Sequence, residues 1–371
     1  MKKLGFGLMR LPLMKEKNDF ASVDIEQAKQ MVDAFIERGF TYFDTAYVYH
    51  QSKGEMITKE VLVKRHARNS FQLATKMPMW EMQTKDDMER IFNEQLDQCG
   101  VTYFDYYLLH SLNQNHYAIA EQVDSFDFVQ KKKAEGKIKR IGFSFHDKVE
   151  LLDEILAAHP EMEFVQLQIN YLDWENEDVQ SRKCYEVARK HGKDVIVMEP
   201  VRGGALAAIP IEAEKLFRDY APEKSIASWA VRFAASKEGV LVVLSGMSNM
   251  EQLLDNASYM QNFIPLNAEE KEIVNKVSDI MTVHLEIPCT ACNYCIDDCP
   301  NHIPIPKYFA LYNVGNRAGA TGFLAQQEDY NTYAKTEGKA SDCIACNQCV
   351  SHCPQKIEIV EMLKKVAGAF E

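Results

Sequence analysis

Short apolar runs alternate with longer amphipathic stretches from the N-terminus of the chain to about residue 260. This alternation is typical of β-α units, in which each buried strand is followed by a helix that covers the growing parallel sheet. The apolar runs predict eight strands, at Lys3–Met9, Phe40–Asp44, Phe71–Lys76, Phe104–His110, Arg140–Ser144, Phe164–Asn170, Asp194–Glu199 and Val240–Ser245.

The amphipathic stretches between these strands predict a matching set of eight helices. Glycines punctuate several of their ends, where a left-handed cap residue is required. Eight strands with eight helices is the count of a closed (β/α)8 barrel of the TIM type, an α/β fold. An open doubly wound sheet would usually carry a GxGxxG turn after its first strand, and the residues from Gly5 to Arg10 do not fit that turn. The expected helices are Ile25–Arg38, Glu55–Ala67, Asp86–Gln98, Ile119–Glu135, Lys148–Ala158, Asp178–His191, Ser225–Ser236 and Met250–Tyr259.

The composition supports a globular protein of two domains. The 371 residues suffice for a barrel of about 250 residues and a smaller second domain. Apolar residues make up 46% of the chain and charged residues 26%, which permits a large core. The net charge of -12 argues against nucleic acid as a partner, because its phosphates attract basic patches.

The sequence offers no membrane or export signal. No apolar run approaches the ~18 residues of a membrane span. The apolar stretch after Lys3 is interrupted at Arg10, too early for a signal peptide. We therefore expect a cytoplasmic protein with no membrane partner.

Four residues with complementary chemistry fall at or just beyond the ends of predicted strands. In a barrel of this type, catalytic groups gather where strands end. Carbonyl reduction needs a proton on oxygen as hydride reaches carbon, and a tyrosine supplies it only if its pKa, normally about 10, is lowered. A lysine ammonium lowers it, a carboxylate keeps that lysine charged, and a histidine can orient the carbonyl. Each residue alone would more often be structural, but four in register favour catalysis. The four are Asp44, Tyr49, Lys76 and His110.

The segments around these four residues resemble the three tetrad motifs of the aldo/keto reductase superfamily. They are Asp44-Thr45-Ala46-x-x-Tyr49, the run from Leu73 to Lys76, and the run from Asp105 to His110. The similarity covers roughly residues 1–260. It implies NAD(P)H-linked reduction of a small-molecule carbonyl, or oxidation of an alcohol, with Tyr49 as the general acid/base.

The nicotinamide site of that family is matched less completely. The resemblance to its G-x-S-N segment implies that Ser144 holds the nicotinamide amide, with Phe145 in place of the Asn. Gln166 and Asn170 fit its Q-x-E-x-N strand, with Gln168 in place of the acid. These three amides share one strand face. We expect them to line the barrel mouth, because three amides buried in a core would each need a partner.

The segments after the seventh and eighth predicted strands also depart from the family. The usual Y-S-P-L, whose ring stacks on nicotinamide, is replaced by a run that begins at Met198 and has no ring; Arg202 follows it and is expected to bind the cofactor. After the eighth strand, backbone amides and the next helix start form an anion cradle for nucleotide phosphates. Ser248 replaces the basic residue for the 2′-phosphate, so the choice between NADH and NADPH stays open. The cofactor residues implied there are Ser245, Gly246, Met247, Ser248, Gln252 and Asn256.

Eight of the ten cysteines form two runs near the C-terminus, each with the spacing C-x2-C-x2-C-x3-C-P. Bacterial [4Fe-4S] proteins use this run, and the fourth Cys of each run ligates the other run's cluster. Zinc would leave one thiolate over in each half, and disulfides would need an oxidising compartment. The runs predict two clusters, the first on Cys289, Cys292, Cys295 and Cys353, the second on Cys343, Cys346, Cys349 and Cys299.

This stretch is similar to a ferredoxin module, and the whole chain resembles the branch of the superfamily whose barrel is fused to a ferredoxin-like C-terminus. We expect a barrel over residues 1–262, a linker helix over 263–283 and a small, largely helical 4Fe-4S ferredoxin-type domain over 284–371. Within these parts, helices are predicted at Ala268–Thr282 and Ile305–Tyr312, with a glycine-rich stretch around Gly315–Gly322.

Electron counting leaves several functions open. Iron–sulfur clusters pass electrons singly, whereas nicotinamide moves two as hydride. One function is an NAD(P)H-linked reductase whose clusters relay electrons to a ferredoxin or another electron-transfer protein. Another is an FMN-containing reductase, since Phe145, Met198 and Ser248 all alter the nicotinamide site. A third is a non-catalytic nucleotide-binding redox sensor, and the cluster module could also be purely structural.

Overall fold

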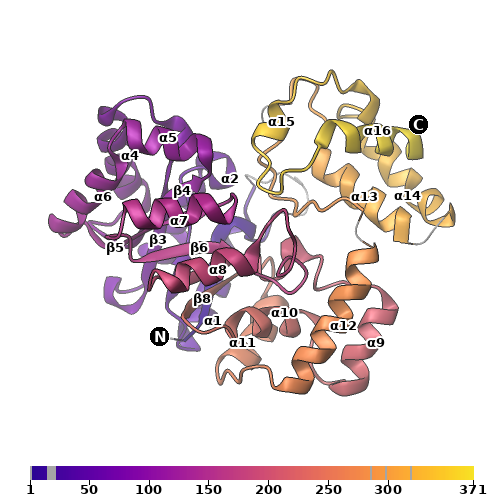
Figure 1. Ribbon diagram of the computed structural model, residues 1–371, viewed down its shortest axis with the longest axis horizontal. Helices are drawn as coiled ribbons and strands as arrows, with labels where there is room; N and C mark the ends of the chain where they lie inside the picture. The colour runs from indigo at the N-terminus through magenta and orange to yellow at the C-terminus, as the bar shows by residue number, and fades with distance from the viewer. Residues whose placement is uncertain (1, 15–21, 285, 297–298, 318–319) are drawn as a thin grey trace. The chain divides into compact units, whose positions relative to one another are not determined.

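The computed structural model describes residues 2–14, 22–284, 286–296, 299–317 and 320–371. Within these residues, eight parallel strands pair in chain order and close into a barrel, because β8 also pairs with β1 (Figure 1). This confirms the predicted (β/α)8 fold. The strands are β1 (Leu4–Gly7), β2 (Tyr42–Asp44), β3 (Gln72–Pro78), β4 (Phe104–Leu112), β5 (Ile138–Phe145), β6 (Phe164–Gln168), β7 (Asp194–Met198) and β8 (Val240–Gly246).

The interior of the barrel is packed with side chains from alternate strands. Tyr42 on β2 and Tyr106 on β4 meet edge to face, with ring centroids 4.9 Å apart. Phe164 on β6 contacts the Tyr106 ring at 5.4 Å between centroids. β5 can approach β6 closely because residue 142 is a glycine: a Cβ at this position would lie 2.3 Å from the Phe164 carbonyl oxygen. A filled interior confines any site to the strand ends and their loops.

Several helices of the barrel begin or end at residues that satisfy their terminal backbone groups. Asp24 caps α1 by accepting a hydrogen bond from the Gln27 amide. Thr84 and Asp87 form a capping box at the start of α4, which ends at Gly100 with φ +69°. The helices are α1 (Ile25–Glu37), α2 (Tyr49–Ser52), α3 (Gly54–Thr58), the π-helical turn η2 (Lys59–Val63), α4 (Lys85–Cys99), α5 (Gln114–Gln122), α6 (Ser125–Ala134), α7 (Val149–Ala158), α8 (Ser181–Lys190), α10 (Ile226–Ala235) and α11 (Met250–Met260).

Two of the helix predictions were wrong in detail. The stretch Ile119–Glu135 forms two helices, α5 and α6, because Asp124 lies between them in a left-handed conformation with φ +56°. A residue in that conformation interrupts the helical hydrogen-bond ladder. The stretch Glu55–Ala67 forms the short α3, which passes into the π-helical turn η2 and ends at Val63.

Contacts divide the chain into two compact units. The first comprises Met1–Pro200 and Ala227–Asn267 and contains the barrel strands; the second comprises Val201–Ile226 and Ala268–Glu371. The second unit therefore includes a segment that follows β7 as well as the C-terminal part of the chain. The predicted domain limits near residues 262 and 283 stay a prediction. No helix in the described part of the chain combines the length and the apolar character that a membrane crossing requires.

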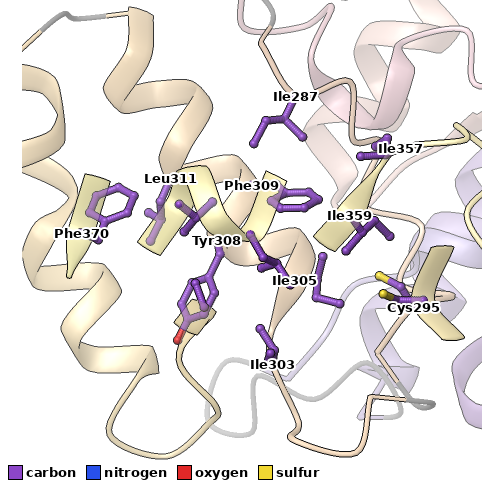
Figure 2. Close-up of a cluster of buried hydrophobic side chains, with 14 of the residues drawn as sticks. Ile287, Cys295, Ile303, Ile305, Tyr308, Phe309, Leu311, Ile357, Ile359 and Phe370 are labelled. Carbon is purple, nitrogen blue, oxygen red and sulfur yellow. The ribbon is translucent and has the colours of Figure 1, made fainter. Parts of the chain in front are cut away.

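The second unit is built around an apolar core (Figure 2). Tyr308 on α13 packs on Tyr330 of α14, with ring centroids 4.5 Å apart. The Tyr330 ring also stacks on Phe370 of α16, with centroids 5.0 Å apart. Cys295 belongs to the same core and lies at one side of it. The packing of these helices therefore fixes part of the cysteine-bearing backbone.

The described part of this unit is largely helical, as expected, but only some of its helices were predicted. The helices expected at Ala268–Thr282 and Ile305–Tyr312 are present, and α9, α14, α15 and α16 were not predicted. The helices of this unit are α9 (Ile211–Tyr220), α12 (Ala268–His284), α13 (Ile305–Arg317), α14 (Ala320–Tyr333), α15 (Gln348–Ser351) and α16 (Ile359–Phe370).

We expect Gly142→Ala to destabilise the barrel by about 1–3 kcal/mol, because the added methyl group would overlap the Phe164 carbonyl and ring and push β5 away from β6. Gly368→Ala in α16 is the matched control. Nothing lies within 4 Å of the Cβ position at Gly368, so this change should be neutral or stabilise by about 0.5–1 kcal/mol. Urea unfolding measures both. A Gly142→Ala variant as stable as the wild type would contradict the packing described.

Candidate functional site

Lys76 is the centre of a polar site near the carboxyl ends of β2 and β3. Its Nζ donates hydrogen bonds to Asp44 Oδ1 at 2.5 Å and to the Thr45 carbonyl oxygen at 2.7 Å. It also donates to the Tyr49 hydroxyl oxygen at 3.1 Å. All three donors of the ammonium therefore have an acceptor. Lys76 is 1% exposed, Asp44 2% and Tyr49 8%, so the group is almost completely withdrawn from water.

Burial and charge act against each other in this group. Burial lowers the pKa of Lys76, and the carboxylate of Asp44 opposes that change. Burial likewise raises the pKa of Asp44, opposed by Lys76 and by a hydrogen bond from Gln166 Nε2 to Asp44 Oδ2 at 3.2 Å. Each group depends on its partner to stay ionised. The arrangement holds a buried cation against the oxygen of a phenol.

His110 lies on β4 beside these residues and is 3% exposed. Its ring centroid is 6.4 Å from that of Tyr49 and 5.1 Å from that of Trp80. Its Nδ1 is buried and has no hydrogen-bond partner in the part of the chain that the structure describes. Burial, followed by the charge of Lys76, lowers the pKa of His110 well below its usual range. The ring is therefore neutral at physiological pH and keeps one N–H, which can donate a hydrogen bond to a carbonyl oxygen.

The amide row on and just after β6 is buried and has partners of its own. Gln166, Gln168 and Asn170 are 2%, 5% and 0% exposed. Gln168 Nε2 and Asn170 Nδ2 donate to Asp173 Oδ2, at 2.7 and 2.8 Å. Buried amides therefore do find partners here, and the argument by which the sequence analysis placed them at the barrel mouth is wrong. Gln166 still joins the polar site, through its hydrogen bond to Asp44.

Ser144 and Phe145 end β5 with different roles. The Ser144 Oγ is the acceptor of a hydrogen bond from the Ser111 amide at 2.7 Å, so the hydroxyl proton is not used in that bond. Phe145 is 3% exposed, and its ring meets that of Phe143 edge to face at 6.4 Å between centroids. The position where the family presents an amide is thus filled by a packed ring.

The segment after β8 is held by the start of α11. Asn249 caps that helix by accepting from the Gln252 amide at 2.9 Å, and Gln252 Oε1 accepts from the Ser248 amide at 2.7 Å. Asn256 Nδ2 donates to Ser245 Oγ at 2.8 Å. Gln252 and Asn256, both expected to contact the cofactor, therefore also hold the segment after β8 through hydrogen bonds to its serines. Their contact with a nucleotide stays a prediction.

Arg10 is a neighbour of this segment that the sequence analysis missed. Its side chain lies over Gly246, where an added Cβ would meet Arg10 Cβ and Cδ at 3.0 Å. Ser248 Oγ donates to the Arg10 carbonyl oxygen at 3.0 Å, and Met247 is buried. β1 and β8 pair with Gly7 opposite Gly246, which brings the residue after β1 to the expected phosphate segment. A basic residue just beyond the first strand was the signal available in the sequence.

Arg202 belongs to the second unit and is 2% exposed. Its Nη2 donates to the Pro288 carbonyl oxygen at 3.3 Å. The next residue, Gly203, has φ +65°, and a Cβ there would lie 2.2 Å from the Thr290 carbonyl oxygen. The segment after β7 therefore packs against the residues that flank the first cysteine, Cys289. Binding of the cofactor by Arg202 stays a prediction.

Each predicted set of four cysteine ligands lines its own cavity in the second unit, and each cavity contains about 330 Å³ of space that is partly open to solvent. The fold thus brings the fourth cysteine of each run to the cavity of the other run, as the crossed pattern requires. The first cavity is lined by Cys289, Cys292, Cys295 and Cys353, and the second by Cys299, Cys343, Cys346 and Cys349.

Neighbouring thiols in these cavities influence one another, and those of Cys295 and Cys349 resist ionisation. Burial, followed by the neighbouring Cys292 and Cys289, raises the pKa of Cys295. Burial, followed by Cys343, raises the pKa of Cys349 to about 11. Among the described residues, no three His, Cys, Asp or Glu side chains converge on a point that suits a single metal ion. Thiols spaced around a cavity fit a polynuclear cluster better than one zinc ion.

Comparison with protein families assigns both parts of the chain. The sequence model of the aldo/keto reductase family matches residues 3–279, and that of the 4Fe-4S dicluster domain matches residues 288–358. Among curated proteins, the uncharacterized oxidoreductase YqkF of Bacillus subtilis is 23% identical over an alignment of 287 residues, which covers 68% of this chain and 85% of that protein.

Solved structures share the barrel. Aldo-keto reductase AKR11C1 from Bacillus halodurans, in its holo form, is 24% identical with a TM-score of 0.59, over 74% of this chain and 91% of that chain. An aldo-keto reductase from Klebsiella pneumoniae in complex with NADPH is 20% identical with a TM-score of 0.58, over 74% of this chain and 90% of that chain. At these identities the solved structures support the fold alone.

We expect Asp44→Asn to lower the free energy of unfolding by about 3–5 kcal/mol, because it leaves the Lys76 ammonium buried without a counter-charge. Lys76→Met should also destabilise. The double variant should be less destabilised than the sum of the two single changes, by a coupling of about 0.5–3 kcal/mol. Urea unfolding of the four proteins gives this coupling without any assay of activity.

The surface pair Glu26–Lys29, whose atoms are 2.7 Å apart, provides the control. Breaking it by Glu26→Gln should cost about 0–1 kcal/mol, because water solvates both charges. If Asp44→Asn cost no more than Glu26→Gln, the buried ion pair would not be what holds this site together.

Proposed function

We propose a function for this chain, which belongs to the aldo/keto reductase family and is an oxidoreductase: it reduces a small-molecule carbonyl with NAD(P)H, or oxidises the corresponding alcohol, and Tyr49 is the general acid/base. The observation that carries this proposal is the buried Lys76 ammonium, which is shared between the Asp44 carboxylate and the Tyr49 oxygen. Nothing in a purely structural ion pair requires a phenol as its third partner.

The geometry accounts for the proton that the reaction needs. When bound, NAD(P)H supplies the hydride to the substrate carbon. Because the Tyr49 oxygen accepts from Lys76, the phenol proton is not used in that bond and can pass to the substrate oxygen. The ammonium stabilises the phenolate that remains. His110 donates a hydrogen bond from its N–H to the substrate oxygen and so orients the carbonyl.

Residues at the ends of β5, β8 and β1 suit a nucleotide. The Ser144 hydroxyl is placed to donate to the nicotinamide amide, since its oxygen is the acceptor for Ser111. The segment from Ser245 to Ser248 offers backbone amides near a helix start, and Arg10 adds a basic side chain. Ser248 carries no charge, so we expect NADH and NADPH to bind with similar affinity. The Klebsiella pneumoniae relative in complex with NADPH supports a nicotinamide cofactor.

We further propose that the second unit binds two [4Fe-4S] clusters in the crossed pattern. The two cysteine-lined cavities and the match to a 4Fe-4S dicluster domain support this assignment. When bound, such clusters carry single electrons. The partner that fits this chemistry is a ferredoxin or another one-electron carrier protein.

FMN is the second candidate for the barrel, favoured by the buried Phe145 ring at the position of the amide donor. A flavin converts between two-electron and one-electron chemistry, and its phosphate could use the segment after β8. Anaerobic purification followed by flavin extraction distinguishes the two: about one FMN per chain supports this candidate, and a colour due only to iron–sulfur removes it. Tight nucleotide binding without turnover of any carbonyl in a panel would instead indicate a redox sensor.

Tyr49→Phe should lower kcat for carbonyl reduction by about 10²–10⁴-fold, because no other group replaces the phenol proton at Lys76. Nucleotide affinity, measured by fluorescence quenching, should change little because the ring is retained. The control is Tyr47→Phe, which removes a hydroxyl that donates to Glu94 at 2.9 Å. Full activity in Tyr49→Phe, or an equal loss in Tyr47→Phe, would rule out Tyr49 as the acid.

Paired cysteine variants test the crossed clusters. Cys295→Ser with Cys353→Ser changes two residues of one cavity and should leave one cluster, with about four irons per chain. Cys295→Ser with Cys299→Ser changes two neighbours in sequence that line different cavities, and should disturb both clusters. Iron and acid-labile sulfide analysis with EPR of the reduced protein gives the counts. Cys184→Ser, in α8, should keep about eight irons. An intact cluster in the second pair would contradict the crossing.

A further inference from the structure

A second buried carboxyl lies close enough to Lys76 to influence its charge. Glu55, on α3, is 0% exposed. Its Oε1 accepts hydrogen bonds from Thr75 Oγ1 at 2.5 Å and from Gln95 Nε2 at 2.8 Å. Gln95 Nε2 also lies 3.0 Å from the Lys76 carbonyl oxygen, and Gln95 Oε1 accepts from the Tyr107 hydroxyl. Glu55 thus contacts the Thr75 side chain directly and is linked to the Lys76 carbonyl oxygen through Gln95.

The surroundings of Glu55 do not match a settled carboxylate. Its Oε2 is buried and has no hydrogen-bond partner among the residues that the structure describes. A buried carboxylate with half of its acceptors unused is unfavourable, and a neutral acid is the usual outcome. Burial raises the pKa of Glu55 to about 7, although Thr75, Gln95 and Lys76 oppose the change. Both protonation states are therefore accessible near neutral pH.

Lys76 and Glu94 are the charged groups that affect Glu55. Lys76 favours its ionisation and Glu94, on α4, opposes it. The other titratable neighbours stay neutral, because burial raises the pKa of Cys99 on α4, of Tyr107 on β4 and of Tyr47. The charge on Glu55 is therefore felt chiefly by Lys76.

We propose that Glu55 is a positioning residue: by gaining and losing a proton, its carboxyl sets how strongly the Lys76 ammonium acts on the phenol of Tyr49. This inference rests on the proposed role of Tyr49 as the general acid/base. Glu55 touches neither substrate nor cofactor and acts only through Lys76. The proton that it gains or releases is exchanged with solvent.

The sign of the effect follows from the charges. An ionised Glu55 offsets part of the Lys76 charge, so Tyr49 keeps its proton to higher pH. A neutral Glu55 leaves the Lys76 charge to act fully on the phenol, which then releases its proton more readily. Glu55→Gln keeps the shape of the side chain but fixes it in the neutral state at every pH.

We expect Glu55→Gln to move the basic limb of the pH profile for carbonyl reduction to lower pH by about 0.5–1 unit. The acidic limb for alcohol oxidation, which requires the phenolate, should move in the same direction. The matched control is Glu94→Gln, which removes a charge from a side chain that is 37% exposed and should shift both limbs much less. Limbs that stay where the wild type has them would overturn the proposal, since loss of structure alone lowers rates without moving a limb.

A second measurement needs neither a variant nor turnover. In the wild type labelled with ¹³C at glutamate carboxyls, one signal should titrate near pH 7, well above the 4.5 of an unperturbed glutamate side chain. If no glutamate titrates near pH 7, the inference is wrong even in an active enzyme. If one glutamate titrates near pH 7 but no carbonyl compound is reduced, the proposed function fails, whereas the assignment of a titrating carboxyl near Lys76 stands.

Discussion

The barrel site depends on one constraint: a lysine ammonium that is 1% exposed must have a negative partner and three acceptors. Asp44 supplies the charge from the end of β2, and the backbone of Thr45 supplies the second acceptor. The third acceptor is Tyr49, at the start of α2, where His50 and the next residue take φ values above +50°. His50 Nε2 lies 2.7 Å from the carbonyl oxygen of Leu8, the residue just after β1, and this contact holds the strained turn in place. Electrostatics thus dictates the loop geometry that places the phenol.

In the second unit, burial acts against the charged groups that its site requires. Cys295 and Cys349 are buried in an apolar core and four further cysteines pack against it, where burial disfavours the thiolates that ligate iron. Two runs that are far apart in sequence reach common cavities because α13, α14 and α16 pack around Tyr330 and Phe370. The aromatic core therefore positions ligands from both runs, and cluster binding would in turn stabilise this arrangement.

The sequence predicted the parts of the structure that depend on local pattern. Buried parallel strands are continuous apolar runs, so the strands could be located, although β3 and β4 continue two residues beyond the ends predicted at Lys76 and His110. The break at Asp124 was missed because one residue in a left-handed conformation leaves no periodic trace. Helix α14 was missed because its apolar residues show almost no helical periodicity. Glu55 falls at a helix start like many exposed acids, and its burial follows from its contacts with Thr75 on β3 and Gln95 on α4.

The central claim is that Lys76 is a charged group inside the barrel, held by Asp44 and turned on Tyr49. A ¹⁵N NMR titration of the Lys76 side chain tests it most directly. We expect an ammonium signal at neutral pH whose protons exchange slowly with water. The midpoint of the Lys76 titration should lie below the 10.5 of a free lysine because of burial. A neutral amine at pH 7, or a midpoint that does not change when Asp44 is replaced by Asn, would contradict the account.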